Sequence, residues 1–130
     1  MAKIDEDPRP NGELALQTLA MPKDTNSNGD VFGGWLMSQM DLAGAIIARE
    51  VAKGRVTTVA VGSMAFLRPV PVGSTVSFYC EILEIGRSSI KTLVEVWVKH
   101  YERSMQQKVT EGEFVYVAID NSGRTRAVNR

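Results

Sequence analysis

The sequence has few of the side chains that most catalytic and metal sites require. It has one cysteine, Cys80, and one histidine, His100. A single cysteine excludes an internal disulfide, and the two residues together are too few for a zinc or copper site. A serine triad would have to use His100, which lies in a predicted strand, so a structural or surface role is the more ordinary interpretation. Cys80 lies in an apolar strand, where a buried cysteine is more common than a nucleophile.

Recognised catalytic and cofactor motifs are also missing. The stretch 86–90, Gly-Arg-Ser-Ser-Ile, lacks the second glycine of a nucleophile elbow. The aspartates near residues 24–41 do not follow the spacing of a calcium loop, and the glycines at 29, 33 and 34 do not follow a nucleotide-binding fingerprint. We therefore expect no metal and no resident cofactor.

Excess charge and long apolar runs are absent as well. Fifteen Lys and Arg residues balance fifteen Asp and Glu residues, so no net field draws the chain to nucleic acid or to an anionic membrane. The most apolar stretch, residues 35–52, is interrupted by polar and charged side chains, which argues against a membrane span. The N-terminus lacks the apolar core of a signal peptide. We expect a cytoplasmic protein with neither nucleic acid nor membrane as a partner.

The length and the 44% hydrophobic content predict one domain, over residues 13–125. Residues 1–12 are rich in charge, proline and glycine and are predicted to form an N-terminal arm, and residues 126–130 are predicted to form a loose C-terminal tail.

The pattern of apolar residues predicts an α+β fold with one long helix. Residues 33–53 read as a helix, because Leu36, Met40, Ala43, Ile47 and Val51 recur at the three-to-four spacing of a buried stripe, and Gly54 is expected to end it. Strands are predicted at 13–18, 55–67, 75–85, 90–100 and 108–119. Short turns join the last four strands, so we expect a curved antiparallel sheet of about five strands wrapped around the helix.

The helix start and the carboxylate that follows it are the best candidates for chemistry. Asp41 lies two turns inside the predicted helix, and its neighbours at helical spacing are Met37, Ser38, Gly44 and Ala45, which leave room for a ligand. It can serve as a general base or nucleophile, or it can simply face solvent or cap a loop. The N–H groups of Gly33 and Gly34 can hold an oxyanion, while as structure these glycines let the helix start approach the sheet.

The residues resemble a known family. The run 21–41, Met-Pro-x-Asp-Thr-Asn-x-Asn-Gly-Asp-x-Phe-Gly-Gly-Trp-x-Met-Ser-Gln-Met-Asp, is similar to bacterial YciA-type acyl-CoA thioesterases of the hotdog fold. Gly-Arg-Val at 54–56, Thr-Val-Ala-Val at 58–61, Phe-Leu-Arg-Pro-Val at 66–70 and Glu-Val-Trp-Val at 95–98 add to the resemblance. It covers about residues 13–125.

The resemblance implies an enzyme that hydrolyses acyl-CoA to coenzyme A and a carboxylic acid. Its pattern places the catalytic carboxylate at Asp41, an asparagine from the opposite protomer at Asn26, and a threonine at Thr58, although a plain strand role for Thr58 stays open. Similar proteins form double-hotdog dimers, often assembled into hexamers, with active sites between protomers. The coenzyme A moiety is part of the substrate; candidate partners for its phosphates are Arg55, Arg68, Arg87, Ser88, Ser89 and Lys99, for which ordinary surface roles are the alternative.

Two other functions remain open from the sequence. One is a non-catalytic acyl-CoA-binding hotdog protein, and the other is a hotdog hydratase or dehydratase acting on acyl thioesters. The first is disfavoured because a binding protein needs no carboxylate beside the thioester. The second normally pairs a carboxylate with a histidine, and His100 lies far along the sequence from the segment that ends at Asp41. General-base and nucleophilic roles for Asp41 both remain possible.

Overall fold

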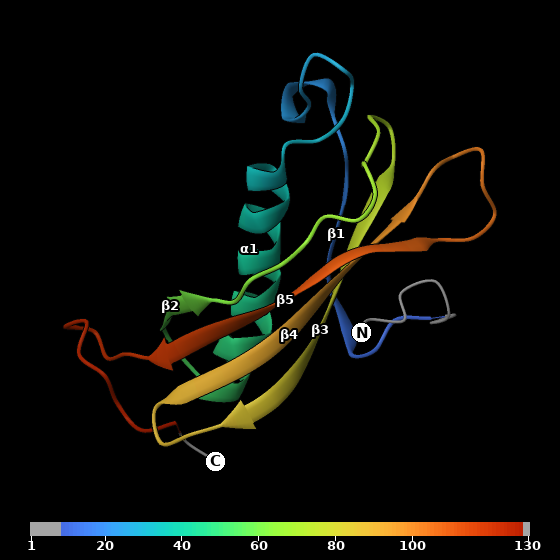
Figure 1. The fold of residues 1–130 in the computed structure, drawn as a ribbon. Helices are drawn as coiled ribbons and strands as arrows, with labels where there is room; N and C mark the ends of the chain where they lie inside the picture. Colours follow the sequence, from blue (N-terminus) through green and yellow to red (C-terminus); the bar gives the residue numbers. More distant parts are fainter. Residues whose placement is uncertain (1–8, 129–130) are drawn as a thin grey trace.

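The computed structural model describes residues 9–128, in which one helix, α1 (Gly33–Ala52), crosses one face of a five-stranded antiparallel sheet (Figure 1). A short 3-10 helix, η2 (Pro22–Asp24), precedes it. The sheet order is β1-β3-β4-β5-β2, and every pairing is antiparallel. The predicted α+β arrangement is confirmed. The strands are β1 (Glu13–Leu19), β2 (Val56–Val61), β3 (Thr75–Ile85), β4 (Ser89–Lys99) and β5 (Gln107–Ala118).

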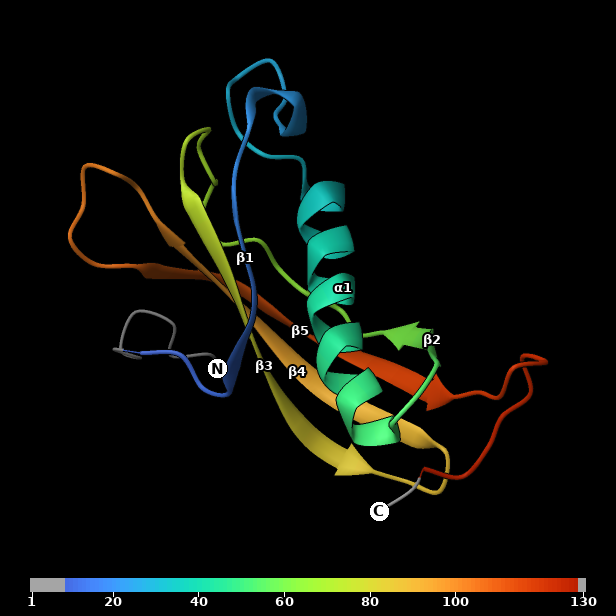
Figure 2. The ribbon, with the colours of Figure 1, turned by 180° about the vertical axis from the view of Figure 1, so that it is seen from behind.

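The core lies between α1 and the concave face of the sheet, which curves around the helix (Figure 2). The predicted stripe is buried at Leu36, Met40, Ala43 and Ile47, whereas Val51 is only partly buried. The helix ends at Ala52, one residue earlier than predicted, and its C-cap is Lys53 rather than Gly54. Lys53 adopts the left-handed conformation at φ 55°, and its N–H bonds to the carbonyl of Arg49. Within residues 9–128, no helix is long and apolar enough to cross a membrane.

The second predicted strand is shorter than expected. β2 ends at Val61 rather than at residue 67, after a register shift against β5 between Thr58 and Ala60. Residues 62–69 then follow β5 through separate contacts: Leu67 N–H donates to the carbonyl of Val109 at 3.1 Å, and Arg68 Nη1 donates to the carbonyl of Lys108 at 2.7 Å. The irregular path has a physical reason, since a bulge and a nearby glycine and proline break the ladder.

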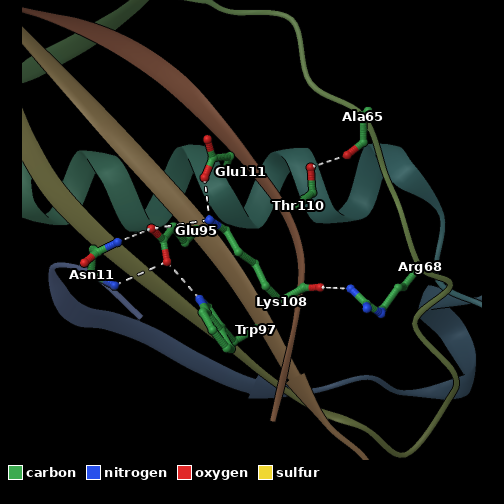
Figure 3. Close-up of polar contacts among 8 residues, drawn as sticks. All are labelled: Asn11, Ala65, Arg68, Glu95, Trp97, Lys108, Thr110 and Glu111. Atoms are coloured by element: carbon green, nitrogen blue, oxygen red, sulfur yellow. Dashed lines mark hydrogen bonds and ion pairs between the residues drawn. The ribbon is translucent and has the colours of Figure 1, made fainter. Parts of the chain in front are cut away.

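Opposite the helix, the sheet carries a buried polar cluster, drawn in Figure 3. Successive strand residues alternate between faces, so Glu95 and Trp97 point away from the core valines of β4. Glu95 accepts hydrogen bonds from Trp97 Nε1 at 2.9 Å and from Asn11 N and Nδ2 at 3.3 Å each. Lys108 Nζ lies 3.6 Å from Glu95 Oε2 and 2.5 Å from Glu111 Oε1. The cluster ties the segment before β1 to β4 and β5.

Both ends of the described chain are held more firmly than expected. The predicted arm falls partly on residues 1–8, which lie outside the described residues, but Asn11 is bound to Glu95. The predicted loose tail falls partly on residues 129–130, also outside them. Residues 126–128 are not loose: Val128 is buried, its N–H bonds to the carbonyl of Arg87, and Arg126 Nη2 donates to the carbonyl of Ala52 at 2.9 Å.

Candidate active site

Asp41 lies on α1 where the helix passes over β2 and β5. Its side chain is partly buried and faces two hydroxyl groups. Thr58 Oγ1, on β2, donates to Asp41 Oδ1 at 2.7 Å. Tyr116 Oη, on β5, lies 2.7 Å from the main-chain carbonyl oxygen of Asp41 and 3.1 Å from Oδ1. The structure thus brings Asp41 and Thr58 together, and it leaves Oδ2 without a hydrogen bond from any residue between 9 and 128.

Tyr116 is the residue that sequence reasoning missed at this site. It is fully buried on the core face of β5, between Phe114 and Ala118. Burial, followed by the charge of Asp41, raises the pKa of its phenol far above the ordinary range. The hydroxyl therefore acts as a hydrogen-bond donor at any working pH. A signal was present, because a tyrosine at a core position of a strand needs a polar partner for its hydroxyl.

The start of α1 presents unpaired backbone donors. The N-cap residue, Phe32, offers no side-chain cap, and the first turn carries no acidic side chain. In the described chain no acceptor bonds to the N–H of Gly33 or Gly34. A Cβ at Gly33 would lie 3.3 Å from the Phe66 ring, whereas one at Gly34 would meet nothing within 4 Å. Packing against Phe66 therefore explains a glycine at position 33, but packing within one chain does not explain the glycine at position 34. The N–H groups of both residues carry the partial positive charge of the helix N-terminus.

Asn26 lies in the loop before α1, with its carboxamide oxygen already used. Oδ1 accepts the N–H groups of Asn28 at 2.8 Å and Asp30 at 3.2 Å, so the side chain closes its own loop. The group that remains for a ligand is Nδ2, which makes no hydrogen bond within the described residues. Asn26 is thus placed as a donor.

One chain holds these groups in two separate places. Gly33 and Asp41 are eight residues apart on a continuous helix, which separates them by about 12 Å at 1.5 Å per residue. Asn26 lies further back, before the helix starts. A single thioester carbonyl cannot contact both the first-turn amides and Asp41 of the same chain. The structure therefore joins Asp41 to Thr58 and leaves Asn26, Gly33 and Gly34 at the other end of the helix.

The six candidates for the coenzyme A phosphates also divide into two groups. Arg87, Ser88 and Ser89 form the turn from β3 into β4, and Arg55 lies beside the same end of β5, where it donates to the carbonyls of Asp120 and Asn121. Arg68 and Lys99 lie toward the other end. β4 runs eleven residues from Ser89 to Lys99, about 33 Å. The six residues cannot meet one phosphate group within a chain.

A cavity of ≈ 240 Å³ adjoins the helix start, lined by Gly33 and Leu36 and by residues 66–70. Its lining is largely apolar, and it opens beside the free amide of Gly33. The described residues contain no group of three His, Cys, Asp or Glu side chains arranged to hold a metal ion.

His100 and Cys80 lie apart from Asp41. His100 follows β4, packs against Tyr101 with ring centroids 4.3 Å apart and the rings tilted by 36°, and accepts a hydrogen bond from the N–H of Glu102. Tyr116 is paired with Ile90, ten residues before His100, so about 30 Å of strand separates the histidine from the Asp41 site in one chain. Cys80 is buried in the core, where desolvation raises the pKa of its thiol to about 11.

A long helix wrapped by an antiparallel sheet, with a carboxylate held on the helix and free amides at its start, defines a hotdog-fold thioesterase. Comparison with known proteins agrees with this class, since the family model described as the thioesterase superfamily matches residues 28–103. The hexameric thioesterase y2039 from Yersinia pestis superposes with a TM-score of 0.90 at 53% identity, covering 94% of this chain and 100% of that one. HI0827, described as a hexameric broad-specificity acyl-coenzyme A thioesterase, superposes with a TM-score of 0.88 at 54% identity, covering 94% and 84%.

The sequence relatives are more specific than the superfamily. The acyl-CoA thioester hydrolase YciA of Salmonella typhimurium is 54% identical over 123 residues, which is 92% of each chain. The chain belongs to the YciA-type acyl-CoA thioester hydrolases.

Proposed function

We propose that the chain hydrolyses acyl-CoA thioesters with the carboxylate of Asp41 as its reacting group. The observation that carries the proposal is the state of that carboxylate: Thr58 and Tyr116 bind one side of it, and Oδ2 receives no hydrogen bond from the described residues. Such an oxygen can accept a proton from water. The structure of an HI0827 variant in which one aspartate is replaced by alanine superposes on this chain with a TM-score of 0.89. That an aspartate was chosen for replacement in this relative supports a functional role for an aspartate.

The reaction follows from the groups available. Asp41 Oδ2 takes a proton from water as the water oxygen attacks the thioester carbon. The carbonyl oxygen becomes an oxyanion, which the N–H groups at a helix start stabilise. The C–S bond then breaks, the sulfur leaves with the electron pair and takes up a proton, and the products are a carboxylic acid and coenzyme A. In the alternative, Asp41 attacks the carbon directly, and water hydrolyses the resulting anhydride.

A second copy of the chain completes the site in this proposal. Asp41 and the first-turn amides are about 12 Å apart in one chain, so the amides of Gly33 and Gly34 and the Nδ2 of Asn26 come from a neighbouring protomer. β2 is an edge strand, and Val59 and Val61 on it are 54% and 43% exposed, a surface suited to pairing with another copy. The hexameric relatives support a hexamer built from such dimers.

The rest of the substrate follows the same geometry. The acyl or pantetheine chain lies in the apolar cavity beside Gly33, and basic side chains from two protomers hold the phosphates. Because Arg68 and Lys99 lie at one end of the sheet and Arg55 and Arg87 at the other, each protomer contributes only one of the two groups to a given coenzyme A. A cytoplasmic location, where acyl-CoA substrates are available, completes the proposal.

The test is release of free thiol from short to long acyl-CoAs by the parent chain and its variants. We expect Asp41→Ala and Asp41→Asn to lose roughly 100-fold in kcat, as removal of a general base does. Glu50→Gln replaces an exposed carboxylate on the same helix and is expected to keep the parent rate. Size-exclusion chromatography checks that each variant keeps its assembly state. Binding of acyl-CoA by the parent without thiol release would overturn the proposal in favour of a binding protein.

A further inference from the structure

The hydroxyl of Tyr116 reaches Asp41 through a notch in α1 at Gly44. The tyrosine is on β5, 75 residues from Asp41 in sequence, and its side chain is 0% exposed. A Cβ built on Gly44 would overlap the phenol oxygen and lie 3.0 Å from the ring atoms Cε1 and Cζ. Contacts under 3.0 Å are not seen for real Cβ atoms, so the phenol occupies this place because residue 44 has no side chain.

The contacts of this hydroxyl restrict the Asp41 side chain. The phenol has one proton and two acceptors on the same residue, the main-chain oxygen at 2.7 Å and Oδ1 at 3.1 Å. Thr58 donates a second hydroxyl proton to Oδ1 at 2.7 Å. Two donors on one oxygen, from two different strands, oppose rotation of the carboxylate. Oδ2 is then the oxygen that remains for water or for the thioester carbon.

We propose that Tyr116 is a positioning residue for Asp41, and that Gly44 is required because it admits the phenol hydroxyl. This inference rests on the proposed role of Asp41. Tyr116 does not contact the substrate in this arrangement, because Asp41 and the helix backbone lie over it. From the sheet side of α1 it orients the carboxylate so that Oδ2 faces the reacting carbonyl. The phenol serves as a hydrogen-bond donor and keeps its proton.

Burial and charge agree with a donor that is not consumed. Desolvation and the neighbouring Asp41 charge hold the pKa of the phenol far above its usual range, so the group keeps its proton through the cycle. Removing the hydroxyl leaves Thr58 as the one remaining donor to Oδ1 among the described residues, which weakens the restraint on the orientation of the carboxylate. Small errors in the position of a reacting group lower the rate of the chemical step, by up to about 100-fold for a misplacement of 1 Å. They change substrate binding far less, because binding uses other contacts.

The experiment compares kcat and KM for Tyr116→Phe and Gly44→Ala in two backgrounds, the parent chain and Asp41→Ala. In the parent we expect each variant to lower kcat about 10-fold while KM stays within about two-fold. In the Asp41→Ala background we expect Tyr116→Phe to change the residual rate by less than two-fold, because the residue acts through the missing carboxylate. Tyr79→Phe is the matched control. Its hydroxyl lies on β3 and, within residues 9–128, accepts one hydrogen bond, from Gln106 Nε2 at 3.4 Å, so its removal is expected to leave kcat unchanged.

Other outcomes separate the inference from the function beneath it. An unchanged kcat for Tyr116→Phe overturns the inference while Asp41 retains its role, and so does an equal loss in both backgrounds, which would mean that Tyr116 acts independently of Asp41. Full activity in Asp41→Ala itself overturns the proposed function instead. Thermal melting accompanies each measurement, and Tyr116→Phe decides the question even where Gly44→Ala fails to fold.

Discussion

Replacing Lys108 by methionine tests the buried polar cluster on the face of the sheet opposite α1. The side chain of Lys108 is 6% exposed and that of Glu95 is 2% exposed. The ammonium lies 3.6 Å from Glu95 Oε2 and contacts Glu111 as well (Figure 3). Methionine keeps much of the apolar stem but removes the only charge that opposes Glu95 among these contacts. The buried carboxylate then keeps, among residues 9–128, the hydrogen bonds from Asn11 and Trp97.

The size of the loss follows from burial. Removing one partner of a buried ion pair typically destabilises a protein by about 3–5 kcal/mol, because the other charge stays away from water. Three hydrogen bonds from Asn11 and Trp97 still reach Glu95, which places the loss at the lower end. We therefore expect Lys108→Met to lower the free energy of unfolding by about 3 kcal/mol.

Lys91→Met is the matched control, since it removes a strand lysine beside Glu113 at 3.9 Å. Those side chains are 42% and 52% exposed. An exposed pair contributes little, so the control is expected to lose less than about 0.5 kcal/mol. Urea unfolding followed by tryptophan fluorescence and circular dichroism, at one protomer concentration, measures both variants. Equal losses for the two variants would refute the reasoning, because burial would then make no difference to the pair.

Two further predictions concern stability. Burial raises the pKa of the Cys80 thiol from 9.0 to about 11. Between pH 9 and pH 11 the thiol therefore ionises in the unfolded chain but stays protonated in the folded one, which favours unfolding. Relative to Cys80→Ala, the parent is expected to lose about 2 kcal/mol of unfolding free energy as the pH rises across that window. A parallel decline in both proteins would contradict this. Arg126→Met removes the hydrogen-bond donors to two carbonyl oxygens, that of Ile119 and that of Ala52 at the end of α1. Chemical denaturation is expected to show a loss of about 1 kcal/mol in the free energy of unfolding, and no loss for the control Arg124→Met, which replaces an exposed arginine. A loss in the control of the same size would assign the effect to charge alone.

Local patterns in the sequence predicted most of the fold. The spacing of Leu36, Met40, Ala43 and Ile47 placed α1, and the structure buries all four. Strand periodicity and turn residues located five strands, four of them to within about two residues at each end. These features are local, because helix and strand periods are written into neighbouring residues. The strand predicted at 55–67 was wrong in length, because an extended apolar segment has the same sequence pattern whether or not it pairs regularly with a neighbouring strand.

The candidate site was predicted in part, for a related reason. Asp41, Gly33 and Gly34 follow from position on one helix, while the roles of Asn26 and Thr58 came from the family resemblance. Tyr116 was missed because its hydroxyl meets Asp41 only once the registers of β5 and β2 are set and α1 has docked.

The sequence by itself determined the long helix, four of the five strands to within about two residues, and the family to which the chain belongs. Tertiary structure alone decided which hydroxyls bind Asp41, which carboxamide atom of Asn26 stays available, and which charges are buried beside Glu95. The physical reason is that periodicity fixes the face a residue occupies, whereas a hydrogen bond between distant strands depends on register and on closeness to within a few tenths of an ångström. The notch at Gly44 is such a case: the missing Cβ is visible in the sequence, but the phenol that occupies its place is visible only in the fold.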